Sequence, residues 1–196
     1  MIIKDGTGTG YQQRVDSNNR AQVFSVGISE NQQATFLGDN YNCNTGEITL
    51  TSANESAVFY LKNTSATDLI VDRLAPSTQA STGGTGNERV KVRVYRNTTG
   101  GDIVTTAADA DMIANKNFGS NETIDALVYK GAEGDTQTGG ALAYIIYVSN
   151  GSSAVIPVDL VLPRGTSICI TMEPTTGNTS QTVYFATSAH YAVSQV

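Results

Sequence analysis

Few residues of this chain could do catalytic chemistry. A Ser or Cys nucleophile needs a base within hydrogen-bond reach, most often a histidine, and the 196-residue sequence contains one, His190. It lies near the C-terminus in Ser188-Ala189-His190-Tyr191. A histidine in a terminal strand is more often a packing or surface residue than a base. We therefore expect a non-enzymatic protein with no catalytic residue.

The residues that could hold a metal or a cofactor are also sparse. Zinc sites need clusters of His and Cys, whereas Cys43 and Cys169 are far apart in the sequence. Asp109-x-Asp111 lacks the longer acidic ladder of a calcium loop. Gly6-Thr7-Gly8-Thr9-Gly10 is followed by turn residues rather than by the helix that a phosphate site requires. No pair of carboxylates stands out for glycoside hydrolysis. We expect no metal and no cofactor.

Composition excludes several kinds of partner. The formal net charge is −6 and the pI is about 4.6, so no basic face for nucleic acid is expected. No run of about 20 apolar residues is present, and the N-terminus does not resemble a secretory signal, so we expect no membrane partner and synthesis in a cytoplasm. A disulfide between Cys43 and Cys169 stays open, because sequence alone does not decide it.

The elements that would position any site are strands. Hydrophobic residues make up 39% of the chain and charged residues 15%, and much of the rest is Thr, Ser, Asn and Gly, which favour strands and turns. Residues 155–183 alternate as short strands with turn residues between them. This spacing predicts an all-β sandwich or barrel. Pro157 lacks a ladder N–H, so its strand is expected at a sheet edge or at a bulge.

The segment Ala141–Ser149 is apolar on both faces. Either it is a central strand covered by loops, which we expect, or Tyr144 and Tyr147 form part of a subunit contact. Asn150-Gly151 follows it and predicts a hairpin to the next strand. Arg89, Lys91 and Arg93 form a basic stripe on another predicted strand; this is either a solvated face, the preferred interpretation, or a patch for an acidic partner.

The N-terminal region differs from the rest. Residues 1–40 combine a glycine run, isolated apolar residues and a polar stretch without a clear period. We predict an arm or a loosely attached strand unit over residues 1–40 and a β-sandwich domain over 41–196. Ile2, Ile3 and Phe24 are then candidates for oligomer or capsid contact, together with Tyr144 and Tyr147. The only helix expected is Ala107–Asn115.

Several strings resemble virion structural proteins of tailed bacteriophages. They are Ile2-Ile3-Lys4-Asp5-Gly6-Thr7-Gly8, Val15-Asp16-Ser17-Asn18-Asn19-Arg20, Asn117-Phe118-Gly119-Ser120, Tyr129-Lys130-Gly131, Thr138-Gly139-Gly140 and Leu160-Val161-Leu162-Pro163-Arg164-Gly165-Thr166-Ser167-Ile168. The resemblance implies a jelly-roll-like antiparallel β-sandwich with an extended N-terminal arm. It also implies display on a capsid, often as a homotrimer that cements capsomers or decorates the head. It brings no catalytic residue with it, and a tail location stays open.

Three functions follow as hypotheses. The first is a virion cement or decoration protein, assembled in the host cytoplasm, whose partners are further copies of itself and the major capsid protein or another virion protein. The second is a carbohydrate-binding or host-recognition module of a phage tail. A hydrolase built on a jelly roll is the third and has the least support.

Overall fold

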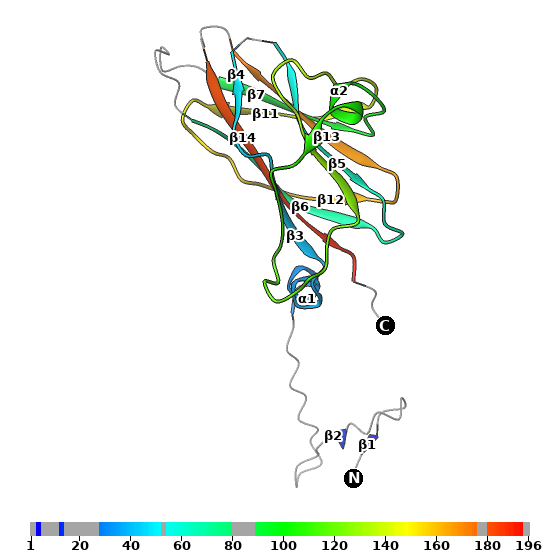
Figure 1. The fold of residues 1–196 in the computed structure, drawn as a ribbon. Helices are drawn as coiled ribbons and strands as arrows, with labels where there is room; N and C mark the ends of the chain where they lie inside the picture. The colour runs from blue at the N-terminus through cyan, green and yellow to red at the C-terminus, as the bar shows by residue number, and fades with distance from the viewer. Residues whose placement is uncertain are drawn as a thin grey trace.

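The computed structural model describes residues 3–4, 12–13, 28–51, 54–79, 89–175 and 180–193. Within these ranges the chain forms fourteen strands and two short helices (Figure 1). Every strand pair in this part of the chain is antiparallel. Of the helices described, neither has the length and apolar content needed to cross a membrane.

Two six-stranded sheets make up the sandwich. The first has the order β11-β7-β13-β5-β10-β8 and comprises β5 (Ser56–Asn63), β7 (Arg89–Arg96), β8 (Ala108–Asp109), β10 (Ala126–Lys130), β11 (Ala141–Ser149) and β13 (Ser167–Pro174). The second has the order β12-β6-β14-β3-β9, with β4 also paired to β14; it comprises β3 (Asn40–Asn44), β4 (Ile48–Leu50), β6 (Leu69–Thr78), β9 (Met112–Asn115), β12 (Ile156–Leu162) and β14 (Gln181–Tyr191). A separate pair joins β1 (Ile3–Lys4) to β2 (Gln12–Gln13).

The strand order is that of a jelly roll. Eight strands form two interleaved four-stranded sets, β3-β14-β6-β12 and β5-β13-β7-β11. The chain crosses from one set to the other at every step except β7 to β11, which pair within one sheet. This is the double Greek-key arrangement. The expected jelly-roll-like antiparallel sandwich is therefore confirmed.

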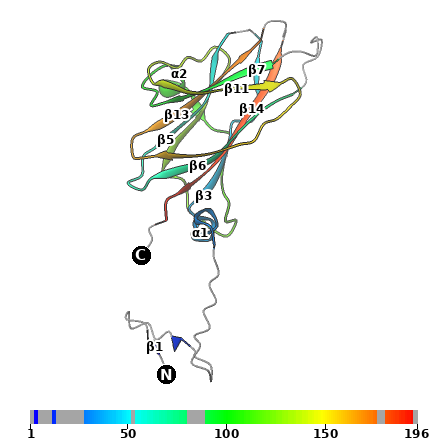
Figure 2. The same cartoon turned by 180° about the vertical axis from the view of Figure 1, so that it is seen from behind.

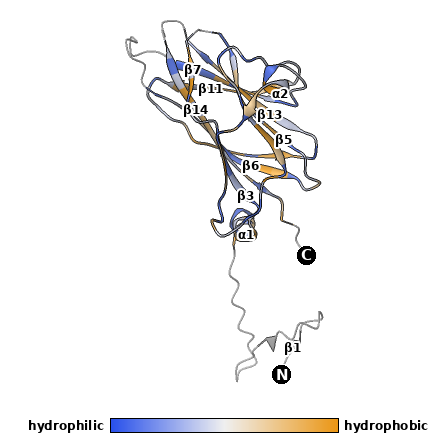
Figure 3. Cartoon of the chain, in the orientation of Figure 1, coloured by the Kyte–Doolittle hydropathy of each residue, from blue (hydrophilic) through white to orange (hydrophobic). Residues whose placement is uncertain are grey.

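The core lies between the two sheets. Along β7, Val90, Val92 and Val94 are buried and alternate with basic residues, as a period of two requires. Phe59 of β5 and Phe185 of β14 join the sheets, with ring centroids 4.8 Å apart. In Figure 3 the hydrophobic colour follows β5 and β13, the strands in the middle of their sheet.

The two helices differ from expectation. α1 (Glu30–Leu37) begins at a capping box of Ser29 and Gln32 and ends at Gly38, whose φ of 86° suits glycine. Only Ala34 of its eight residues is buried, so α1 has no apolar period that sequence analysis could detect. α2 (Asp102–Thr105) places Ile103 over Ala57, Tyr60 and Cys169 on the outside of the first sheet.

The predicted helix over Ala107–Asn115 is wrong. This segment instead contains β8 and β9, which pair with β10 and β3, respectively. Both short strands extend the edges of the sandwich, and the hydrogen bonds of those edges override a weak local helical preference.

Two expectations about the apolar strand Ala141–Ser149 are also wrong. It is β11, which stands at the end of its sheet rather than in the centre. It does not form a hairpin with the next strand, because β11 pairs with β7 and β12 pairs with β6 in the other sheet. The edge position expected from Pro157 is confirmed, since β12 is the end strand of its sheet and has a register shift between Pro157 and Leu160.

The expected division at residue 40 stays a prediction. Most of residues 1–27 lie outside the described part of the chain, which includes nearly all of the expected arm. The described portion before residue 41 contains α1, which contacts β3 and β14. Figures 1 and 2 show α1 next to β3 at one end of the sandwich.

Candidate functional site

One edge of the first sheet is open in the described structure. β11 pairs with β7 on one side and is the end strand on the other; Figure 2 shows the two strands side by side. The backbone N–H and C=O groups along the outer side of an end strand have no ladder partner. None of the nine residues of β11 is charged and none is proline. Apart from a register shift between Leu142 and Tyr144, the strand therefore lacks the usual features that prevent pairing with another chain.

The side chains of β11 leave large apolar groups in solvent. Tyr147 is 56% exposed, Leu142 49%, Ile145 47% and Tyr144 44%. The chain next to and within β12 adds the exposed Val155 and Val161. We call the four exposed residues of β11 the open edge; together with Val155 and Val161 they account for six of the thirteen exposed large hydrophobic side chains in the described ranges. Such a grouping marks an interaction site more often than it marks ordinary surface.

The register of β11 shows how its two faces differ. Ile145 and Tyr147 lie opposite Arg93 and Lys91 of β7, on the outside of the sandwich. Val148 lies opposite Val90 on the inside and is buried. Tyr144 is on the inner side, opposite Val94, yet remains half-exposed on this end strand. The two tyrosines predicted as contact residues are thus both accessible at one edge.

β12 is an end strand of a different kind. Pro157 removes one donor, and Asp159 places a charge on the strand. Asp159 also has a φ of 47°, in the left-handed region that few residues other than Gly, Asn and Asp adopt. A register shift interrupts its ladder with β6 between Pro157 and Leu160. Each of these features hinders strand addition, so β12 is a protected edge.

One residue of the predicted basic stripe, Arg93, is neutralised by ion pairs. Arg93 forms ion pairs of 2.9 Å with Glu55 and 2.6 Å with Glu173. Burial lowers the pKa of Arg93, but the bond to Glu173 and the charges of both carboxylates outweigh it, so the pKa lies above its ordinary value. Tyr95 donates a 3.1 Å hydrogen bond to Glu55 in the same group. Arg93 is therefore not available to an acidic partner, while the role of Arg89 and Lys91 stays a prediction.

The other predicted contact residues are not brought to this edge by the described structure. Ile2 and Phe24 lie outside the described residues. Ile3 belongs to the short β1, and its side chain is not described. Their contact role stays a prediction.

His190 lies inside the fold and not at an open site. It is 4% exposed, and its Nδ1 lies 2.8 Å from Oδ1 of Asp72. Ser188 donates to the other oxygen of Asp72 at 3.3 Å, so this hydroxyl is oriented by the carboxylate. Burial raises the pKa of Asp72, but hydrogen bonds from His190 and Asn31 and the charge of nearby Lys116 bring it below the usual 3.8. The group packs β6 against β14.

The two cysteines are unpaired and buried in different places. Cys43 lies in the core between the sheets, and Cys169 lies under α2 on the outside of the first sheet. Burial raises the pKa of both thiols to about 12. They remain protonated at neutral pH and behave as small hydrophobic side chains.

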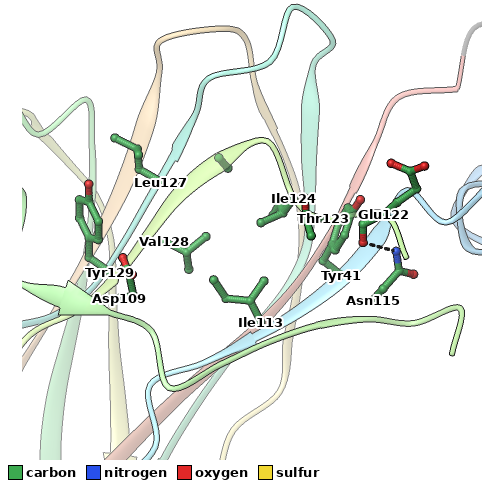
Figure 4. A pocket seen from close by; sticks show the side chains of 11 residues that line it. Tyr41, Asp109, Ile113, Asn115, Glu122, Thr123, Ile124, Leu127, Val128 and Tyr129 are labelled. Atoms are coloured by element: carbon green, nitrogen blue, oxygen red, sulfur yellow. Dashed lines mark hydrogen bonds between the residues drawn. The ribbon is translucent and has the colours of Figure 1, made fainter. Parts of the chain in front are cut away.

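A pocket of about 330 Å³ lies at the opposite side of the sandwich, between β9 and β10 (Figure 4). Ile113, Ile124 and Val128 provide its apolar surface. Glu122 and Asp109 are also among its lining residues. Asp111 binds Lys130 at 2.7 Å, and no metal-binding group of three or more His, Cys, Asp or Glu occurs in the described ranges.

The sequence as a whole matches no protein-family model and no curated protein. Several solved structures show a distant likeness to the fold. VP2 of infectious bursal disease virus, as a D431N mutant in derived T=1 particles, is 12% identical with a TM-score of 0.33 over 78% of this chain and 35% of that one. A CBM22-1–GH10 segment of Clostridium thermocellum xylanase 10B, complexed with xylohexaose, is 13% identical with a TM-score of 0.30, over 79% and 27%. The chain spans about a third or less of these proteins, and TM-scores this low carry no inference about function.

Proposed function

We propose that this chain is a non-enzymatic structural protein of a bacteriophage virion, a cement or decoration protein that binds the head as a symmetric oligomer. The observation that carries the proposal is the open edge, an uncharged end strand with large apolar side chains in solvent. A protein that acts by contact area needs such a surface. The jelly-roll strand order and the phage-like strings of the sequence support the virion setting.

The described interior supports a non-enzymatic role. The single histidine is enclosed between β6, β14 and its carboxylate partner. Both thiols are protonated at neutral pH. Two acidic side chains near β11, Glu55 and Glu173, are engaged in ion pairs with Arg93.

Mass spectrometry of purified particles tests the proposal. A cement or decoration protein is present in a copy number near a multiple of the capsomer count, measured against the major capsid protein. Virion localisation and binding to that protein are both part of the proposal. A handful of copies per particle would indicate the tail instead, and absence from purified particles would contradict a structural role altogether.

A carbohydrate-binding module of a phage tail is the second candidate. Tyr144 and Tyr147 expose about half of their side chains, and tyrosine rings can stack on sugars. A glycan array with the wild-type chain and Tyr147→Ala separates the two functions. Binding that the substitution abolishes would favour the tail module, whereas a cement protein binds capsids and no glycan.

A further inference from the structure

The open edge has the properties of a surface made for a second strand. Its outer backbone groups have no ladder partner among the described residues. A strand added there would form hydrogen bonds with these backbone groups. Its side chains would also contact those of β11 on both faces of the sheet. The occupant should be uncharged along its length, because a charge placed among the apolar side chains of this strand loses hydration.

A second copy of β11 meets this requirement. The whole chain carries a net charge of −6, so two copies repel unless the contact itself is locally uncharged. All nine residues of β11 are uncharged. On the outer face of the neighbouring β7, Arg93 is paired with Glu55 and Glu173, and Lys91 lies opposite Tyr147. Two β11 strands therefore meet without opposing like charges.

The exposed apolar area of the open edge comes close to what a specific interface needs. Leu142, Tyr144, Ile145 and Tyr147 are each about half exposed. At roughly 150–250 Å² for a large side chain, they offer on the order of 400 Å² per copy. The strand backbone and the neighbouring Val155 add to this, so two copies approach the roughly 1,000 Å² expected of a specific protein interface.

We infer that β11 pairs antiparallel with β11 of a second copy across a twofold axis, which joins two sheets into one continuous sheet. The contact is isologous, with the same surface on both copies. This inference rests on the proposed function, because both take β11 as the contact surface, and it identifies the partner as a second copy of the chain. It predicts dimers, in place of the trimers that the phage resemblance implies.

The register follows from the bulge in β11. The ladder to β7 shifts between Leu142 and Tyr144, so the regular part of the strand is Tyr144–Ser149. In a twofold pair, directly opposite residues share a face. If the axis passes through Ile146, Tyr147 of each copy lies opposite Ile145 of the other, which gives two equivalent pairs. Pairs of an aromatic and a β-branched residue stabilise sheets.

Sedimentation equilibrium of the full chain tests the pairing. The wild type should be a dimer, and Ile145→Glu should weaken dimerisation at least tenfold, because each copy then buries a carboxylate at the contact. Val161→Glu is the matched control, since Val161 is 55% exposed on the protected edge, and it should dimerise as the wild type does. A wild-type monomer, a trimer, or an Ile145→Glu variant that dimerises normally would overturn the inference.

A disulfide cross-link tests the pairing without introducing a charge into the strand. Ile146→Cys brings the two introduced thiols together on the axis, within the range of about 4.4–6.8 Å between Cα atoms that a disulfide spans. Ile145→Cys lies off the axis and serves as control, and the native thiols are buried. A disulfide-linked dimer should form with the first variant and not the second; the reverse result or no cross-link contradicts the register. If dimers form but purified particles lack the chain, the pairing stands and the virion role fails.

Discussion

β11 and β12 are the two end strands on one side of the sandwich, and they differ in the features that hinder pairing with another chain. Both expose an unpaired edge of comparable length, nine residues in β11 and seven in β12. β12 carries Pro157, Asp159 and a register shift, whereas β11 carries none of these over Tyr144–Ser149. The apolar side chains are also more numerous on β11.

This difference indicates that the open edge is used. An exposed, uncharged end strand invites uncontrolled pairing and aggregation, and the sequence prevents it at β12. The protection at β12 leaves one accessible edge on this side, which gives a contact a defined place and orientation. A protein with two open edges would form chains of copies, whereas one open edge that pairs across a twofold axis forms a closed dimer.

The largest expected effect contrasts the two faces of β11. Val148→Asp places a carboxylate at a buried position and should lower the free energy of unfolding by about 3–5 kcal/mol. Tyr147→Asp lies on the exposed face opposite Lys91 and, at concentrations at which the chain is monomeric, should change it by less than about 1 kcal/mol. Urea unfolding of both variants measures this. Equal losses would mean that the outer face of β11 is buried by something else.

A smaller loss is expected at the ion pairs beside β11. Arg93→Met leaves Glu55 and Glu173 without their cation, and we expect the free energy of unfolding to fall by about 1–3 kcal/mol. The two carboxylates also place negative charge next to the open edge, so dimerisation should weaken and become stronger again at high salt. Sedimentation at two salt concentrations checks this. Arg89→Met, at an exposed position, is the control.

Asp72 belongs to β6, the strand with which β12 pairs. The pKa of Asp72 is lower in the folded state than its ordinary value of 3.8. The ionised carboxylate therefore stabilises the fold at pH values above 3.8, and this stabilisation is lost as the pH falls through the folded pKa. Asp72→Asn should therefore cost about 1–2 kcal/mol at pH 7 and reduce the loss of stability below pH 4. Thermal unfolding across this range tests the sign. Dimerisation at neutral pH should not change.

The smallest effect comes from removing the protection of β12. The double substitution Pro157→Val and Asp159→Asn restores a donor and removes the charge, while asparagine tolerates the positive φ. Stability should change by less than about 1 kcal/mol. Light scattering should then show assemblies larger than the dimer, which we do not expect of the wild type. No increase in size would show that the bulge alone protects this edge.

Much of this architecture follows from local sequence patterns. The period of two identifies β7, β11 and β12, and the missing N–H of Pro157 places β12 at an edge. The same pattern does not tell which sheet a strand joins, because it describes faces and not neighbours. For that reason Asn150-Gly151 suggested a hairpin that does not exist, and β11 was expected in the centre.

The candidate site was found in part. Tyr144 and Tyr147 were identified from the two-faced pattern, but the open edge depends on strand order, which is set by contacts far apart in the chain. The missed α1 did leave a local signal, the capping box of Ser29 and Gln32 followed by Gly38. The position of His190 in the sequence indicates a packing or surface residue, and the structure shows packing. Its partner Asp72 is not predictable from local sequence, because the two residues are 118 positions apart.

Hydrogen exchange at the two edges tests the central claim most directly. Amide exchange is measured by mass spectrometry on the wild-type chain at concentrations well below and well above that at which it dimerises. We predict that peptides covering Tyr144–Val148 gain protection at the higher concentration, whereas peptides covering Ile156–Leu162 exchange at the same rate in both. Protection that rises at β12, or that fails to rise at β11, would contradict the assignment of β11 as the contact strand.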